Sequence, residues 1–199
     1  MINIFTKIRI KYLANKNNNK DFTIFSSNCI GGVITSELGV RFNSPFVNLW
    51  LYPSDYIKFL KNPKKYINCK LKFCKEENIN YPIGVLDDIK IYFYHYKDEN
   101  DAELCWNRRK RRINFDNIFI IFTDRDGCTY QNLIDFDNLP YKNKIVFTHK
   151  IYPEIRSSFY IKGYENDAQV GNLVAQEGLF IKKHKYEKFN YVKWLNDKK

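Results

Sequence analysis

The sequence lacks an apolar run that approaches the roughly 20 residues of a membrane-spanning helix. It also lacks a recognisable secretory signal, an internal repeat and a low-complexity linker. Its five cysteines are an odd number and do not have the paired spacing of a zinc site, so they indicate reduced thiols. We therefore expect a cytoplasmic protein, with peripheral contact at the inner face of a membrane left open.

The 199 residues suit one domain with a substantial core rather than two domains. A hydrophobic content of 44% and a charged content of 28% are typical of globular proteins. The net charge of +11 favours an anionic partner, such as coenzyme A, a nucleotide sugar or acidic lipid. No nucleic-acid-binding signature is present, and the aromatic residues lie mostly inside strand-like runs, so we expect no nucleic-acid partner.

Residues 1–20 combine apolar and basic residues and end in an asparagine-rich stretch. They are predicted to form a basic N-terminal extension, with a short amphipathic helix that either packs against the domain or contacts a membrane surface. Residues 21–199 are predicted to form a single α/β domain.

Strand-like and helix-like segments alternate through this domain. Apolar runs rich in Ile, Val and Phe are typical of buried strands, and residues 98–112 begin with acidic and end with basic residues, as a helix dipole favours. This alternation predicts a three-layer α/β/α fold with a mainly parallel sheet. The predicted helices are 30–38, 54–62, 98–112, 129–136 and 187–195, and the predicted strands are 22–26, 46–51, 71–74, 89–94, 117–122 and 144–148, with 81–88 as a turn or short strand.

Reactive side chains follow three of the apolar runs directly. In an open α/β sheet, ligands bind outside the carboxyl ends of the strands. If the three strands are parallel, a thiol, carboxylates and an imidazole meet at one edge and form a catalytic site. The runs and the reactive residues after them are 22–26 with Cys29, 117–122 with Asp124 and Asp126, and 144–147 with His149.

Cys29 is the first candidate nucleophile, because a thiolate is stabilised at a helix N-terminus. The amides of Gly31 and Gly32, with Asn28 or Ser27 as side-chain donors, are candidates for stabilising an oxyanion. Ser27 and its neighbour Ser26 are alternative nucleophiles. A cysteine here is also compatible with a small buried side chain at a strand–helix turn.

His149 is the best candidate for a general base among three histidines, because an imidazole titrates near neutral pH. His95, which closes another apolar run, is the second choice, and His184 lies between lysines and is predicted to be solvated. Asp124 is predicted to orient His149, as the third member of a catalytic triad does.

Asp124 and Asp126 flank Arg125 in a pattern that also resembles the metal-binding carboxylates of glycosyltransferases. Arg109 falls on the apolar face of the 98–112 helix, so it should pair with a carboxylate such as Asp124 or with an anionic ligand. Arg125, Asp126 and Lys150 are further candidates for binding the substrate. The sequence alone leaves these roles open.

Several of these motifs resemble a bacterial family that is known as a domain of unknown function. Its members are often labelled exopolysaccharide biosynthesis proteins or acetyltransferases, and they resemble components of capsule, exopolysaccharide and lipopolysaccharide gene clusters. The turn around Cys29 is more faintly similar to that of coenzyme A-binding proteins of capsule clusters. The segments that carry the resemblance are FSSNCIGG (25–32), RFNSP (41–45), YPIG (81–84), WNRR (106–109), TDRDGC (123–128), FTHK (147–150), YPE (152–154) and YVKWL (191–195).

The resemblance and the residues together favour an acyltransferase that acts on a surface-polysaccharide precursor. Cys29 would attack an acyl-coenzyme A thioester, His149 would move the proton and Asp124 would orient the imidazole. We expect no tightly bound cofactor and no metal in this mechanism. Two alternatives remain: a glycosyl- or phosphosugar transferase that holds a divalent metal with Asp124 and Asp126, and a non-catalytic assembly factor of the polysaccharide machinery.

Overall fold

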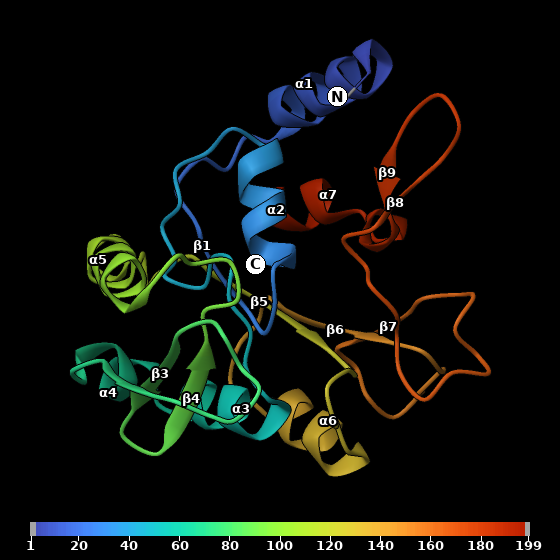
Figure 1. The fold of residues 1–199 in the computed structure, drawn as a ribbon. Coiled ribbons are helices and arrows are strands. Elements are labelled where there is room, and N and C mark those ends of the chain that lie inside the picture. The colour runs from blue at the N-terminus through green and yellow to red at the C-terminus, as the bar shows by residue number, and fades with distance from the viewer. Residues whose placement is uncertain (1–2, 198–199) are drawn as a thin grey trace.

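The computed structural model describes residues 3–197 and has a parallel sheet between two layers of helices (Figure 1). The predicted three-layer α/β/α fold is confirmed. Helices α2 and α7 lie on one side of the sheet, and α3 and α6 lie on the other. In spatial order, the strands are β1 (Thr23–Ser26), β5 (Ile118–Thr123), β6 (Lys144–Thr148) and β7 (Ser158–Tyr160).

All neighbouring strands of this sheet are parallel. The predicted strands that precede Cys29, Asp124 and His149 are therefore β1, β5 and β6, and they are adjacent in that order. Their carboxyl ends meet at one edge of the sheet, as the sequence predicts. Almost every residue of these three strands is buried, which explains their continuous apolar runs.

Seven α-helices are present in residues 3–197, and most of them follow predicted helical segments. Helix α5 begins after Asp98, whose side chain accepts a hydrogen bond from the Asp101 amide at 2.8 Å. Helix α6 begins with a capping box of Thr129 and Asn132. The helices are α1 (Ile4–Lys16), α2 (Ile30–Glu37), α3 (Pro53–Lys61), α4 (Pro63–Asn68), α5 (Glu99–Lys110), α6 (Tyr130–Asp137) and α7 (Tyr191–Asn196).

A small antiparallel sheet of β2 (Lys72–Cys74), β3 (Ile83–Leu86) and β4 (Ile89–Tyr92) lies beside the main sheet. The chain between α2 and α3 joins the two sheets. Its Trp50 forms an antiparallel bridge to Tyr92 of β4, and its Leu51 amide donates to the Ser27 carbonyl at 3.0 Å. These bonds bring the end of β4 close to the end of β1.

Two parts of the secondary-structure prediction are wrong. Residues 46–51 form no strand beyond the single bridge at Trp50, because Asn48 has a φ of 60° and turns the chain. Phe46, Val47, Leu49 and Leu51 are nevertheless buried, so the apolar pattern reports burial rather than a strand. The predicted 187–195 helix is a 3₁₀ turn at Lys185–Lys188 followed by the short α7.

The C-terminal region also contains strands that the sequence did not predict. Strand β7 is short and half-buried, and β8 (Gln176–Glu177) pairs with β9 (Lys183–His184) as a two-residue ladder. Segments of two or three residues are too short to show a hydrophobic period. None of the helices within residues 3–197 has the length and apolar composition needed to cross a membrane.

Candidate functional site

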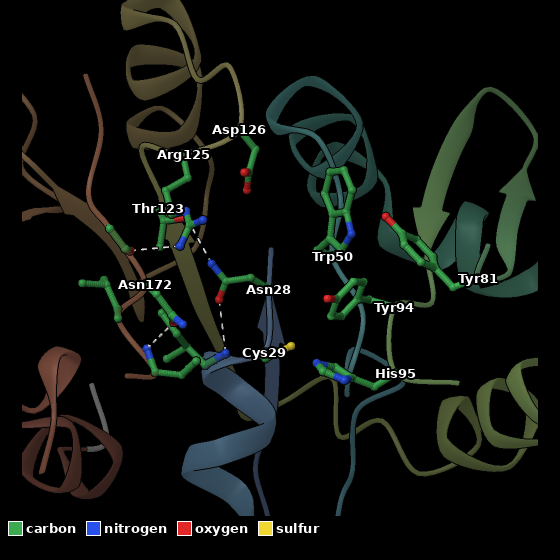
Figure 2. Close-up of a pocket in the computed structure, with 14 residues that line it drawn as sticks. Asn28, Cys29, Trp50, Tyr81, Tyr94, His95, Thr123, Arg125, Asp126 and Asn172 are labelled. Carbon is green, nitrogen blue, oxygen red and sulfur yellow. Dashed lines mark hydrogen bonds between the residues drawn. The ribbon is translucent and has the colours of Figure 1, made fainter. Parts of the chain in front are cut away.

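The carboxyl ends of β1 and β5 border a cavity of about 410 Å³. Figure 2 shows polar residues from these strand ends on one side and aromatic residues from the small sheet and its connections on the other. A cavity of this size accommodates a small molecule. The lining residues are Asn28, Cys29, Ile30, Trp50, Tyr81, Tyr94, His95, Thr123, Arg125, Asp126, Gly171, Asn172, Leu173 and Val174.

Cys29 is the N-cap residue of α2 and lines this cavity. Its side chain makes no capping hydrogen bond, and Figure 2 shows the thiol directed across the cavity toward the ring of His95. Burial raises the pKa of the Cys29 thiol above its ordinary value, because the charged form loses hydration. The resting thiol is therefore protonated at neutral pH, and a nucleophilic reaction needs a base.

Asn28 supports the turn that presents Cys29. Its side-chain oxygen accepts a hydrogen bond from the Ile30 amide at 3.1 Å, and its Nδ2 donates to Thr123 Oγ1 at 3.1 Å. These contacts tie the start of α2 to the end of β5. They leave one N–H of the Asn28 amide for a ligand, so the predicted oxyanion role remains a prediction.

Gly31, Gly32 and Ser27 do not line the cavity, although the sequence suggested them as oxyanion donors. Both glycines are buried, and Gly31 lies against β1: a Cβ on Gly31 would lie 2.7 Å from Ile24 Cγ2 and 2.9 Å from Ser26 Cβ. Gly31 therefore allows α2 to approach β1 closely. Ser27 is buried and its backbone amide donates to the Ile121 carbonyl of β5, so its place in the fold is structural.

Asp124 and His149 are in direct contact, as predicted. Asp124 Oδ2 lies 2.5 Å from His149 Nδ1 and accepts a hydrogen bond from the His149 backbone amide at 2.7 Å. Asp124 Oδ1 accepts a third from the Val170 amide at 2.8 Å. Both side chains are buried, with 4% and 8% of their side-chain areas exposed. The carboxylate thus joins the end of β5 to β6 and to the segment that carries Gly171 and Asn172.

The structure does not bring His149 to Cys29. His149 does not line the cavity, and no hydrogen bond joins the two residues within the described chain. The physical reason is the strand order: β5 separates β1 from β6, and two strand spacings amount to about 10 Å. The imidazole that faces Cys29 belongs to His95, the second choice of the sequence analysis.

His95 and the aromatic residues of the cavity depend on the small sheet. The His95 amide donates to the Asn48 carbonyl at 3.4 Å, and Trp50 stacks on Tyr92 with a centroid distance of 4.2 Å. Tyr81 and Tyr94 pack edge to face at 5.1 Å. This wall is not apparent from the sequence, because 46–51 has the apolar pattern of a strand and aromatic residues within apolar runs are typical of a core.

Arg125 and Asp126 line the cavity, and their role in binding a substrate stays a prediction. Arg125 Nη1 donates to the Gly171 carbonyl at 3.0 Å, whereas its buried Nε has no hydrogen-bond partner in residues 3–197. Arg125 also forms no salt bridge in that part of the chain. An arginine without a carboxylate partner in a cavity is suited to bind an anionic group.

Asp124 and Asp126 do not face the same space. Asp126 lines the cavity in a left-handed turn with a φ of 59°, whereas Asp124 is buried against His149 and Val170. Within residues 3–197, no group of three or more His, Cys, Asp and Glu residues has a geometry that could hold a metal ion. The predicted role of this pair as metal ligands therefore has no support from their arrangement.

Arg109 and Lys150 lie away from the cavity. Arg109 donates to the hydroxyl of Tyr96 and stacks over Phe42 at 5.6 Å, so the expected contact with Asp124 is absent. Its apolar surroundings are balanced by aromatic faces and a hydroxyl instead of a carboxylate. Lys150 is exposed, and its carbonyl accepts a hydrogen bond from Thr148 Oγ1 at 2.8 Å.

The prediction that His184 is solvated is wrong. It is 8% exposed, its Nε2 lies 3.3 Å from Glu37, and its ring stacks on Tyr186 at 5.1 Å. Burial opposes a charge on the imidazole, but hydrogen bonds to Glu37 and to the Val174 carbonyl outweigh it and raise the pKa of His184 above its ordinary value. Lys183 is exposed and Lys185 is half-buried, so the charges beside His184 in the sequence do not report its own burial.

Residues 1–196 match the family described as "Domain of unknown function (DUF1919)". The chain belongs to this family. A protein of Haemophilus influenzae, described as an uncharacterized protein, is 45% identical over 184 residues. The match covers 92% of this chain and 88% of the relative. The DUF1919 resemblance therefore extends over nearly all of the fold and the cavity.

Proposed function

We propose that this DUF1919 protein is an acyltransferase in which Cys29 carries the acyl group. The observation that supports this most directly is the position of Cys29: it is the N-cap residue of α2, it lines the cavity, and its thiol faces the imidazole of His95 (Figure 2). Covalent acyl transfer requires a thiol and a base in the same small-molecule cavity, and both Cys29 and His95 line this one.

His95 is the general base in this proposal. The Asp124–His149 pair has a positioning role, because it fixes the carboxyl ends of β5 and β6. The thiol is protonated at rest, because burial raises the pKa of Cys29. His95 is exposed and lines the same cavity, so it can exchange protons with solvent between steps. Asp124 and His149 are buried, do not line the cavity, and hold the β5 and β6 ends together.

The reaction then has two balanced steps. The Cys29 sulfur attacks the carbonyl of an acyl-coenzyme A, the bond from the acyl carbon to the coenzyme sulfur breaks, and the thiol proton passes through His95 to the departing thiolate. A hydroxyl of the acceptor next attacks the acyl carbon, the bond to Cys29 breaks, and the hydroxyl proton passes through His95 to the Cys29 sulfur.

The walls of the cavity support this choice of donor and acceptor. Arg125 lines the cavity, its Nε has no hydrogen-bond partner among the described residues 3–197, and its guanidinium suits a phosphate of coenzyme A. Trp50 and Tyr94 provide flat apolar faces for an adenine or sugar ring. The acceptor class, a precursor of capsule, exopolysaccharide or lipopolysaccharide, follows from the resemblance of the sequence motifs.

The proposal is tested by measuring coenzyme A release from acetyl-coenzyme A in the presence of glycan acceptors. We expect Cys29→Ala to lose the activity, whereas Cys69→Ala, a half-buried thiol outside the cavity, retains it. Full activity of Cys29→Ala would exclude the covalent mechanism.

A ligand experiment separates the acyltransferase from its two alternatives. Acyl-coenzyme A should raise the unfolding temperature of the native protein but raise it much less in Arg125→Met. Stabilisation only by a nucleotide sugar with a divalent cation would indicate a glycosyl- or phosphosugar transferase. If no donor stabilises the protein and substitutions of the polar residues that line the cavity leave polysaccharide structure unchanged, the assembly-factor alternative is favoured.

A further inference from the structure

Exposed apolar side chains gather on one surface of the molecule. Of the 13 large hydrophobic residues that are exposed within residues 3–197, seven lie on α1 or in the turn between β8 and β9. Leu179 is 82% exposed, Phe180 70% and Ile8 60%. We call this the α1–hairpin surface; its apolar members are Ile4, Phe5, Ile8, Tyr12, Leu179, Phe180 and Ile181.

The two parts of this surface are joined by hydrogen bonds. Asn3 Nδ2 donates to the Phe180 carbonyl at 2.8 Å, and the Lys182 amide donates to Thr6 Oγ1 at 3.0 Å. Figure 1 shows α1 and the β8–β9 hairpin at the same end of the molecule, away from the small antiparallel sheet. The surface is therefore continuous although its parts are about 170 residues apart in sequence.

The outward direction of the apolar residues on α1 is fixed by contacts of its opposite face. Arg9 forms salt bridges with Glu37, at 3.3 Å, and with Glu187, and all three side chains have at most 10% of their area exposed. Thr6 is fully buried and Leu13 packs against the core. At 3.6 residues per turn, this leaves Ile4, Ile8 and Tyr12 on the outer face.

The charges around this surface are mostly positive. Helix α1 contains no acidic residue, and its exposed Lys7, Lys11 and Lys16 flank the apolar stripe. Lys183 adds an exposed positive charge at the hairpin, where Glu177 is the nearby acidic residue. Lysines beside an apolar helix face can reach phosphate groups while the apolar side chains enter a lipid interface.

We propose that the α1–hairpin surface docks on a membrane that contains anionic phospholipid. Helix α1 lies along the membrane plane, with Ile8 and Phe180 at the boundary of head groups and acyl chains and Lys7 and Lys11 at the phosphates. A second copy of the chain is a poorer partner, because two such surfaces would bring their lysines together. This docking does not depend on the chemistry of Cys29.

The test is co-sedimentation of the full chain with vesicles of phosphatidylglycerol and phosphatidylcholine, at low and physiological ionic strength. We expect partitioning onto the anionic vesicles and at least tenfold weaker partitioning onto pure phosphatidylcholine. The double variant Ile8→Ser/Phe180→Ser should lower partitioning at least tenfold. Leu104→Ser/Ile151→Ser removes exposed apolar residues elsewhere, 62% and 68% exposed, and should retain native partitioning.

A charge-reversed pair separates this surface from a general effect of the basic chain. Lys7→Glu/Lys11→Glu should weaken partitioning strongly, whereas Lys110→Glu/Arg111→Glu, in the basic block on and after α5, should weaken it only slightly. The proposal is overturned if native protein does not bind anionic vesicles at low ionic strength. It is also overturned if the control variants lose binding equally, or if the α1 variants only abolish self-association.

Discussion

At the residue scale, each candidate side chain is defined by the groups that surround it. Cys29 and His95 face a cavity, whereas Asp124 and His149 are buried in contact with one another and do not line it. Both pairs combine residue types that catalysis uses, so only burial and direction separate a reacting group from a positioning group.

The sequence identified Cys29, Arg125 and Asp126 at the cavity, because polar residues after buried strands are visible as a pattern. It ranked His149 above His95, whose ring faces the thiol, because the order of the strands is not visible in one sequence.

A comparison of two histidine variants tests the assignment of the base. His95→Gln should lower the rate of acyl transfer by about 10²–10⁴-fold and remove the imidazole-dependent limb of the pH–rate profile. His149→Gln should reduce the rate less and leave the shape of that profile unchanged, since His149 only holds the ends of β5 and β6 in position. Steady-state rates measured across pH distinguish the outcomes. A larger loss of rate and a changed pH–rate profile in His149→Gln, with little effect of His95→Gln, would show that His149 is the base.

The Asp124 carboxylate should contribute to stability as well as to the shape of the site. It accepts three hydrogen bonds in a buried position, and an amide in its place presents an N–H to one of these donors. Asp124→Asn should therefore lower the free energy of unfolding by about 1–3 kcal/mol in urea titrations. Asp126→Asn is the matched control and should change it little, because asparagine tolerates a positive φ. Equal stability of the two variants would contradict this account of Asp124.

At the element scale, the packing of α2 against β1 sets the position of Cys29. Helix α2 contacts Ile24 and Ser26 of β1 through Gly31, where no side chain fits, and this brings its N-cap to the edge of the sheet. The sequence predicted this helix correctly, but it suggested that the backbone amides of Gly31 and Gly32 stabilise an oxyanion. Both close packing and amide exposure use glycine, and only the contacts of the folded chain separate the two uses.

Two alanine variants measure this packing. Gly31→Ala should destabilise the protein by about 1–3 kcal/mol, because the new Cβ would overlap Ile24 and Ser26. Gly32→Ala is the control, since its Cβ would lie 3.4 Å from Val47 Cγ1, an ordinary contact, and alanine favours a helix. We expect Gly32→Ala to be neutral or to stabilise by up to about 1 kcal/mol in thermal or urea unfolding. A larger loss for Gly32→Ala than for Gly31→Ala would refute the packing argument.

Elements with a long hydrophobic period or run were predictable, and those fixed by distant contacts were not. The buried runs of β1, β5 and β6 are long enough for their apolar composition to identify them as strands. The starts of α5 and α6 are marked by capping residues in the local sequence. In contrast, 46–51 is held by Asn48 and a single bridge, and β8 and β9 have two residues each. Their conformations depend on neighbours that the local sequence does not reveal.

At the scale of the whole molecule, a buried charge network joins the N-terminal helix to the rest of the fold. Arg9 of α1 contacts Glu37 of α2 and Glu187 near the C-terminus, and His184 contacts the same Glu37. Burial disfavours the charged forms of Glu37 and His184, but their ion pair and hydrogen bonds outweigh this effect. The pKa of Glu37 is therefore lowered, and the pKa of His184 is raised. The stability of this region should therefore depend on pH.

The sign of that dependence follows from the raised pKa of His184. The favourable contribution of the charged imidazole is fully present below its ordinary pKa of 6.5 and is lost as pH rises through the raised value in the folded protein. The loss of stability caused by His184→Gln should thus be largest near pH 6 and shrink at higher pH. Urea unfolding of both proteins between pH 6 and pH 9 measures it, with His95→Gln as the control for loss of an exposed imidazole. A loss that grows with pH would contradict the prediction.

The central claim is that Cys29 becomes acylated, and intact-protein mass spectrometry after rapid mixing with acetyl-coenzyme A tests it most directly. We predict one added acetyl group, located by peptide mapping on Cys29, removed by hydroxylamine and absent from Cys29→Ser. His95→Gln should acquire it more slowly, and Cys128→Ser should acquire it normally, since burial raises the pKa of the Cys128 thiol to about 12 and that residue does not line the cavity. Acetylation on another residue, or turnover of acetyl-coenzyme A without any acyl group on Cys29, would contradict the account.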